Sequence, residues 1–140
     1  IDTFYSNDHN SEKRFNKKTH LEFVKNRFKE LGDTVELKQG LSWECLSEYP
    51  DDHFDWLYID ADHTYDSVKK DLQESKRVLK EEGTIVMNDY IMYDHFMKED
   101  YGVVRATNEF LIENDFEMLY FALHPHMFCD VLIRKRREGQ

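Results

Sequence analysis

Apolar runs of strand length alternate along this chain with segments whose apolar residues recur at helical spacing. Residues 54–59 form an almost continuous apolar run, which is typical of a strand covered on both faces. Tyr65, Val68 and Leu72 then fall on one side of a helix that should end before Gly83, and residues 84–87 form the next buried strand. This alternation predicts an α/β fold with a mostly parallel sheet and helices on both faces.

The same patterns organise the rest of the chain. Helical spacing predicts further helices over residues 12–31, 42–46 and 103–114, and short strands are expected at 1–4 and 35–37. The last two expected strands, 116–123 and 127–133, are joined by so short a connection that they must form an antiparallel hairpin. We therefore expect one Rossmann-like domain over residues 1–140, closed by a C-terminal hairpin.

Charge and composition limit the partners of such a domain. The chain has 140 residues, 19 of them basic and 29 acidic, so its net charge of −10 would repel nucleic acid. Its longest apolar stretch, residues 118–123, is far shorter than the roughly 20 residues of a membrane span. Cys45 and Cys129 form no disulfide framework and suit a reducing compartment. We expect a cytoplasmic domain that binds neither nucleic acid nor membrane.

Polar residues follow two neighbouring strands of the predicted sheet. Asp60 and His63 come directly after the run 54–59, and Asn88 and Asp89 follow the strand 84–87. The carboxyl ends of parallel strands share one rim, so these side chains should lie close together. Carboxylate and amide oxygens of Asp60, Asn88 and Asp89 suit Mg²⁺ or another divalent cation. The imidazole of His63 could take a proton from a substrate hydroxyl there.

A second interpretation of the same segment is purely structural, because Asp60, Asp62 and Thr64 could simply cap the helix that begins near Tyr65. The neighbouring Asn88-Asp89 pair favours the functional interpretation.

A nucleoside could bind at the same rim. Asp2 ends the first expected strand, where acidic residues of nucleotide-binding folds accept ribose hydroxyls, although a terminal aspartate could also be merely solvated. Ser42 and Trp43 offer a hydroxyl and an aromatic face to an adenine ring. Equally, Ser42 could cap a short helix and Trp43 could fill the core.

Taken together, these segments resemble a known family. The stretch FDWLYIDADHTY at 54–65, with Asp71-Leu72, LKEEG at 79–83 and Asn88-Asp89-Tyr90, resembles class I S-adenosylmethionine-dependent methyltransferases. It is most similar to the small O-methyltransferases that act on sugars and other hydroxylated metabolites. The stretches GLSWECL at 40–46 and GVVRA at 102–106 are similar to two further motifs of that branch, so the resemblance spans essentially the whole chain.

The resemblance implies a cofactor, an acceptor and a set of site residues. S-adenosylmethionine would be the cofactor and a hydroxylated small molecule the acceptor. The implied roles are cofactor binding by Asp2, Ser42, Trp43 and Asp60, metal binding by Asp60, Asn88 and Asp89, and catalysis by His63 and Asp60. His63 stands where these enzymes often carry a lysine, and Asn88 stands where an aspartate is common.

One family feature is absent from this sequence. Such enzymes begin with a strand and a turn of the pattern E/DxGxGxG, but no GxG is formed by the five glycines, Gly32, Gly40, Gly83, Gly102 and Gly139. This implies that the first strand of the domain is missing. Two other functions stay open: a non-catalytic Rossmann-like interaction domain that forms a homodimer through an unpaired strand edge, and a metal-dependent hydrolase.

Overall fold

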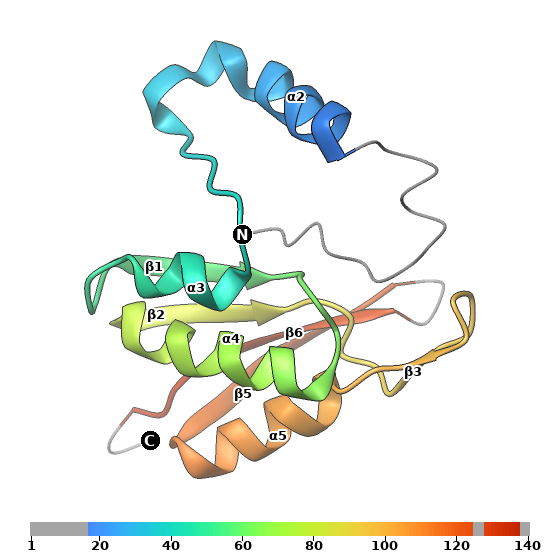
Figure 1. Cartoon of the computed structure of the whole chain (residues 1–140). Coiled ribbons are helices and arrows are strands. Elements are labelled where there is room, and N and C mark those ends of the chain that lie inside the picture. The colour runs from blue at the N-terminus through green and yellow to red at the C-terminus, as the bar shows by residue number, and fades with distance from the viewer. Residues whose placement is uncertain (1–16, 125–127, 138–140) are drawn as a thin grey trace.

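The computed structural model describes residues 17–124 and 128–137, with side chains from Glu22 onward. The expected strand at 1–4, and Asp2 with it, lies outside the described residues. The elements, most of them labelled in Figure 1, are α2 (Lys17–Phe28), the 3₁₀ segment η1 (Lys29–Thr34), α3 (Ser42–Ser47), β1 (Phe54–Ile59), α4 (Tyr65–Val78), β2 (Leu79–Met87), β3 (Tyr93–Asp94), β4 (Glu99–Asp100), α5 (Val103–Glu113), β5 (Phe116–Leu123) and β6 (Cys129–Lys135).

Four strands form the main sheet, in the order β1-β2-β6-β5. β1 and β2 are parallel, with Leu57 opposite Ile85, whereas β6 runs antiparallel to both β2 and β5. The α/β class and the closing hairpin are therefore as predicted. The described part of the sheet is mixed rather than mostly parallel, because neither of the first two expected strands is among its members.

The strand expected at residues 35–37 is not formed. Val35 has extended backbone angles (φ −126°, ψ 120°), but residues 35–39 pair with no strand in the part of the chain that the structure describes. A strand is stabilised by hydrogen bonds to a neighbour. The local pattern is typical of a strand, but among the described residues no neighbouring strand pairs with it, so the structure assigns no strand there.

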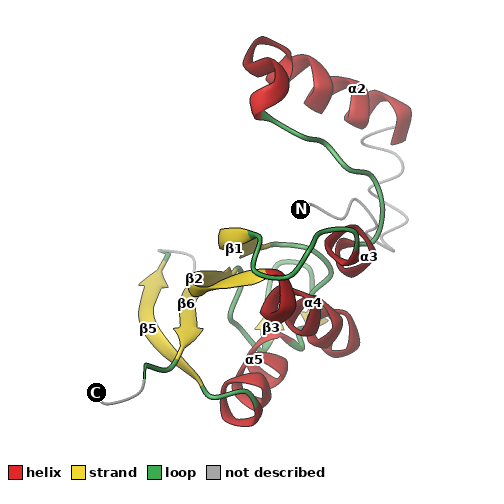
Figure 2. Ribbon diagram, turned by 90° about the vertical axis from the view of Figure 1, so that its left-hand side faces the viewer, coloured by secondary structure: helices red, strands yellow, loops and turns green. Residues whose placement is uncertain are grey.

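The helices α3, α4 and α5 lie on one face of the sheet, as Figure 2 shows. On the other face the register aligns a row across the strands, in which Tyr58 pairs with Val86, Val86 with Leu132, and Leu132 with Tyr120. Tyr58 and Tyr120 are 40% and 72% exposed. No described helix covers this row, which differs from the predicted helices on both faces; α2 continues into η1 and lies away from the sheet (Figure 1).

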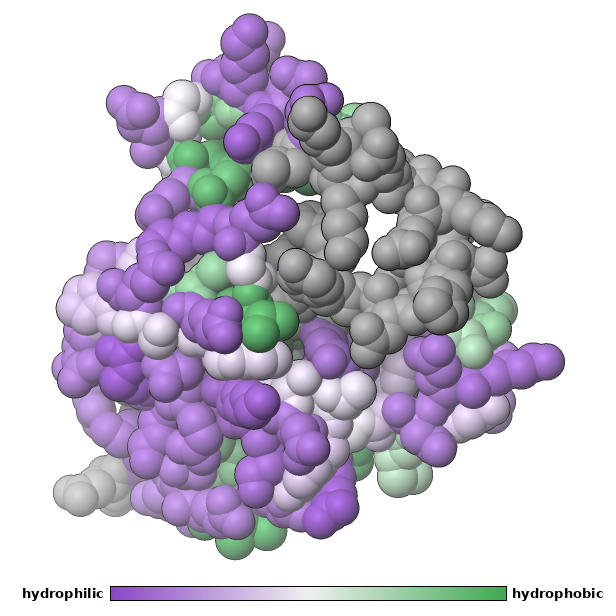
Figure 3. All heavy atoms as spheres, viewed as in Figure 1, coloured by the Kyte–Doolittle hydropathy of each residue, from purple (hydrophilic) through white to green (hydrophobic). Residues whose placement is uncertain are grey.

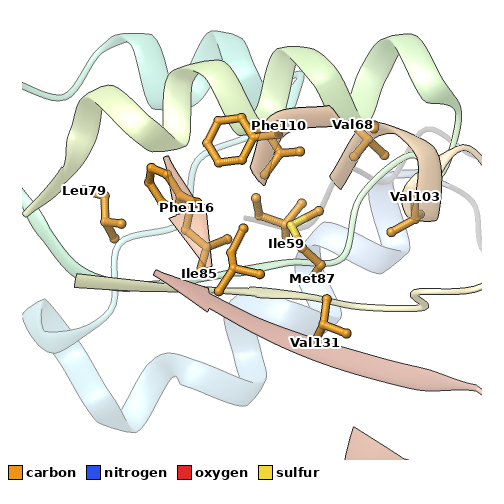
Figure 4. Packing of buried hydrophobic residues seen from close by; sticks show 12 residues of the cluster. Ile59, Val68, Leu79, Ile85, Met87, Val103, Phe110, Phe116 and Val131 are labelled. Carbon is orange, nitrogen blue, oxygen red and sulfur yellow. The ribbon is translucent and has the colours of Figure 1, made fainter. Parts of the chain in front are cut away.

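The core lies between the sheet and the helices on its covered face. Ile85 and Met87 of β2, Val131 of β6 and Phe110 of α5 belong to one buried cluster, in which the Phe110 and Phe116 rings lie 4.8 Å apart (Figure 4). Full burial of one such side chain stabilises the fold by roughly 1.5–3 kcal/mol. This packing fixes the carboxyl ends of β1 and β2 relative to the helices that follow them.

The outer side of the helices is largely hydrophilic, as Figure 3 shows. Within the described residues, no helix combines the length and the apolar character that crossing a membrane requires.

Candidate functional site

His63 lies between two carboxylates at the ends of neighbouring strands. Its Nε2 atom is 3.7 Å from Oδ1 of Asp60, just after β1, and 3.7 Å from Oδ2 of Asp89, two residues after β2. The backbone joins the same two strand ends, since the Asn88 amide donates a hydrogen bond to the Ile59 carbonyl (2.9 Å). The structure thus brings together Asp60, His63 and Asp89, as the sequence predicted, with Nε2 buried and lacking a hydrogen-bond partner.

Asp62, not Asp60, serves the start of α4. One oxygen of Asp62 accepts a hydrogen bond from the Thr64 amide and the other accepts one from the Ser67 hydroxyl, both at 2.9 Å. Thr64 is the N-cap residue by position, but its side chain makes no capping bond. The capping interpretation is therefore right for Asp62 and does not account for Asp60, whose side chain is half exposed and turns toward His63.

A second group of hydrogen bonds supports the end of β2. The side-chain nitrogen of Asn88, Nδ2, donates to the hydroxyl of Tyr58 (3.0 Å) and to Oδ1 of Asp130 (3.1 Å). The Tyr58 hydroxyl donates to Oδ2 of Asp130 (3.1 Å). Burial and the charge of Asp130 raise the pKa of Tyr58, so its hydroxyl stays a donor. This network fixes the backbone that carries Asp89.

Asp89 itself adopts a left-handed backbone conformation (φ 49°), which aspartate tolerates better than most residues. Burial raises the pKa of its carboxyl group; the neighbouring His63 acts in the opposite direction, while Asp60 and Asp130 raise it further. The negative charge of Asp89 is therefore disfavoured both by burial and by nearby carboxylates.

An open cavity of about 610 Å³ lies at this rim. Its polar lining comes from Asp60, Asn88, Asp89 and Asp130, and its apolar lining includes Leu123 and Phe128. This volume is in the range of small-molecule sites, which combine apolar walls with a few convergent polar groups.

Ser42 lies away from this cavity. It is the first residue of α3, whose N-cap position is held by Leu41, so the predicted capping role is wrong. Its hydroxyl is buried and donates a hydrogen bond to Oδ1 of Asp71 on α4. Trp43 is partly buried and lies under the ammonium group of Lys70, 4.7 Å from the ring centroid. A cofactor contact of Ser42 or Trp43 stays a prediction.

The three predicted metal ligands do not fit a metal centre in this arrangement. One oxygen of Asp60 and one of Asp89 each lie 3.7 Å from Nε2 of His63, so the imidazole stands beside both carboxylates. The side-chain nitrogen of Asn88 donates to Tyr58 and Asp130, so only the carbonyl oxygen of this side chain could bind a cation. Throughout residues 17–124 and 128–137, no group of three or more His, Cys, Asp or Glu side chains is arranged to hold a metal ion.

Three residues of this region were missed from the sequence. Tyr101 stacks on His63, Asp94 binds Tyr101, and Asp130 binds Asn88. Asp130 could have been found, because it starts the antiparallel strand β6, and the start of such a strand lies beside the carboxyl end of its neighbour. The positions of Asp94 and Tyr101 depend on the path of a loop, for which the sequence carries no signal.

Comparison with known proteins finds solved structures of the same fold. The chain has a TM-score of 0.58 and 18% identity to precorrin-6y C5,15-methyltransferase from Geobacter metallireducens, covering 86% of this chain and 63% of that one. A methyltransferase from Podospora anserina, solved with S-adenosylhomocysteine bound, has a TM-score of 0.58 and 19% identity to this chain. The match covers 84% of this chain and 56% of that one. A protein from Pyrococcus horikoshii has a TM-score of 0.60 and 13% identity, and the match covers 82% of this chain and 66% of that one.

These likenesses show the fold, and this chain spans 56% to 66% of the length of the three structures. No curated protein matches the chain. A family described as a methyltransferase domain matches residues 2–90, which is more than half of the sequence. The chain therefore belongs to this methyltransferase domain family.

Proposed function

We propose that this domain transfers a methyl group from S-adenosylmethionine to a hydroxyl group of a small molecule, such as a sugar, with His63 as the general base. The observation that carries the proposal is the placement of Nε2 of His63. This atom lacks a hydrogen-bond partner, lies 3.7 Å from both the Asp60 and Asp89 carboxylates, and borders residues that line the 610 Å³ cavity.

The two carboxylates suit His63 to this role. As the acceptor oxygen would bond to the methyl carbon, the bond from that carbon to the sulfonium sulfur would break with its electron pair going to sulfur, and the hydroxyl proton would pass to Nε2, which makes the imidazole an imidazolium ion. Asp60 and Asp89 stabilise that positive charge by proximity. The other products are the methyl ether and S-adenosylhomocysteine, and His63 then returns the proton to solvent. No step requires a metal ion.

The cofactor would bind beside Asp60. S-adenosylmethionine supplies an electrophilic methyl group on a sulfonium sulfur. The Asp60 side chain is half exposed at the end of β1 and lines the cavity, so it can accept hydrogen bonds from ribose hydroxyls. The Podospora anserina structure of the same fold contains S-adenosylhomocysteine, which supports a ligand of this class. Asp2 would accept the same hydroxyls.

Two measurements test this proposal. Calorimetry should show saturable binding of S-adenosylhomocysteine, weakened in Asp60→Ala. Mass spectrometry should then detect methylation of a simple hydroxylated probe, either catechol or a methyl glycoside, and His63→Gln should lower that rate by about 10²–10⁴. His53→Gln is the matched control, because His53 is exposed and distant from the cavity lining. Absence of S-adenosylhomocysteine binding, or full activity of His63→Gln, would refute the proposal.

The alternative function, an interaction domain without catalysis, is favoured by one observation. Among the described strands β1 pairs only with β2, so its other edge is open, with Trp56 62% exposed and a cavity of about 250 Å³ alongside. Unpaired edges of this kind recruit strands from other chains. A stable dimer in sedimentation equilibrium that binds no S-adenosylhomocysteine would favour this homodimer; a monomer that binds it would exclude the alternative.

A further inference from the structure

The imidazole of His63 is held on its flat side by one aromatic ring. The His63 and Tyr101 rings lie with their centroids 4.5 Å apart and their planes inclined by only 4°. Neither carboxylate is within hydrogen-bond distance of Nε2, since both lie at 3.7 Å. At this nitrogen, therefore, the ring orientation is set by packing on Tyr101 rather than by a hydrogen bond.

Tyr101 is in turn fixed by a buried carboxylate. Its hydroxyl donates a hydrogen bond to Oδ2 of Asp94 (3.1 Å), while Oδ1 of Asp94 accepts bonds from the amides of Phe96 (2.7 Å) and Met97 (3.1 Å). Asp94 is only 3% exposed. Burial acts to raise the pKa of Asp94, but these hydrogen bonds outweigh it and lower the pKa, so the group stays an acceptor.

The backbone amides of Tyr101 and Gly102 make two further hydrogen bonds. The Tyr101 amide donates to the carbonyl of Met92 (2.9 Å), which closes the hairpin formed by β3 and β4. The next residue, Gly102, donates its amide hydrogen to the carbonyl of His63 (2.8 Å). One segment, residues 92–102, thus holds both the backbone and the ring of His63.

We propose that Tyr101 and Asp94 are positioning residues, which keep the His63 imidazole pointing between Asp60 and Asp89. This inference rests on the proposed role of His63 as a base. Asp94 orients the Tyr101 ring, the ring restricts rotation of the imidazole, and Nε2 stays directed at the space between the carboxylates. Positioning of this kind matters because small displacements of a catalytic group cause large losses of rate.

The spectroscopic test uses the whole chain with ¹³C-labelled histidine. Stacking on an aromatic ring shifts protons upfield, so the His63 ring signals, identified by their loss in His63→Gln, should lie upfield of those of exposed histidines. Tyr101→Leu removes the stack and should move these signals to the position of an exposed histidine. Tyr101→Phe keeps the ring and should leave a partial shift with broader lines, because the bond to Asp94 is lost.

Tyr93→Leu is the matched control in the same hairpin, since the Tyr93 ring contacts His95 (4.9 Å) and not His63. The backbone amide spectrum reports whether each variant is folded. Unchanged His63 signals in a folded Tyr101→Leu protein, or equal shifts in Tyr93→Leu, would overturn the inference. If Tyr101→Leu unfolds, Tyr101→Phe and Asp94→Asn decide it by the same signals.

The kinetic test separates this inference from the proposed function. With catechol as acceptor, Tyr101→Leu should lower kcat by about tenfold to a hundredfold and change KM by less than about twofold. If His63→Gln abolishes methylation while Tyr101→Leu keeps full kcat, the positioning role is wrong and the base is correct. If His63→Gln keeps full activity, the proposed function fails, and the spectroscopic result alone decides whether Tyr101 holds the ring.

Discussion

Ser42 and Asp71 form a buried hydrogen bond across 29 positions of sequence, which joins the first residue of α3 to the middle of α4. One oxygen of Asp71 accepts this bond, and the other has no partner within the described residues. Burial raises the pKa of the carboxyl group to about 6, although the bond from Ser42 acts to lower it. In the folded chain Asp71 therefore keeps its proton up to about pH 6, and at neutral pH it is a destabilising buried charge.

The first prediction is that Asp71→Asn stabilises the protein at neutral pH. Because the folded-state pKa lies above the ordinary value of 3.8, the native state binds the proton more tightly, and stability is lost as pH rises from about 4 to about 6. Asparagine is neutral at every pH. The free energy of unfolding should increase by about 2–3 kcal/mol at pH 8 and change little at pH 4.

Urea denaturation at the two pH values measures this difference. Asp66→Asn is the matched control, since Asp66 is exposed in the first turn of the same helix. An equal effect of Asp71→Asn at pH 4 and pH 8 would show that the carboxyl group is not destabilised by burial.

The second prediction concerns Arg77, which ties the end of α3 to α4. Its guanidinium donates to the carbonyls of Leu46 (3.2 Å) and Tyr49 (2.8 Å) and to the carboxylates of Asp51 and Glu74. Arg77→Met should lower the free energy of unfolding by about 2 kcal/mol, because it leaves two backbone carbonyls without this donor. Arg77→Lys should recover less than half of the loss, since a lysine cannot reproduce the fork of donors.

Thermal unfolding at low and high salt distinguishes the two contributions. The ion pair with Asp51 is largely exposed and should weaken in salt, whereas the carbonyl bonds should persist. Full rescue by Arg77→Lys would mean that only the charge matters.

The third prediction is that Gly102→Ala destabilises the protein and displaces the backbone that holds His63. A Cβ atom on Gly102 would lie 2.2 Å from the backbone nitrogen of Tyr65, so α5 and the start of α4 could not keep their present approach. We expect a loss of about 1–3 kcal/mol in the free energy of unfolding. The methyl group would also strain the bond from the Gly102 amide to His63.

The measurement is chemical denaturation combined with the His63 ring spectrum. Gly83→Ala is a useful comparison, because a Cβ there would also be crowded, by the Leu79 side chain (2.7 Å) and the Lys80 carbonyl (2.9 Å), but lies far along the sequence from His63. An unchanged His63 spectrum in a folded Gly102→Ala protein would contradict this prediction.

Much of the fold follows from local patterns in the sequence. The bounds of β1 and β5, Phe54–Ile59 and Phe116–Leu123, are those predicted, because apolar runs and alternation mark each strand independently of its neighbours. β2 starts at Leu79 rather than near residue 84. The stretch LKEEG has the sequence pattern of a helix end. It belongs to the sheet because Leu79 pairs with Phe54, next to an irregularity in the register of β1 and β2.

The candidate site was predictable where one topological rule applies and not elsewhere. Asp60, His63 and Asp89 meet because parallel strands end at one rim, which the sequence order alone predicts. Tyr101 reaches His63 only through the path of residues 92–102, which no local pattern specifies. Residues 35–37 show the reverse case, in which a good local pattern lacks the tertiary partner that would make it a strand.

The last prediction is that the site does not take up Mg²⁺ while His63 is in place. Nε2 of His63 lies 3.7 Å from an oxygen of Asp60 and from one of Asp89, and the protonated imidazole would repel a cation there. Calorimetric titration should show no saturable binding at about 0.1–1 mM, where weak oxygen-ligand sites begin to fill.

His63→Ala removes the imidazole, lets both carboxylates face the same space, and should bind the ion more tightly than the natural sequence does. Asp89→Asn in the His63→Ala background should remove that gain. Saturable binding to the unaltered chain that disappears in Asp89→Asn would contradict the prediction and restore a metal-assisted mechanism, because the carboxylates would then have to rearrange around the ion.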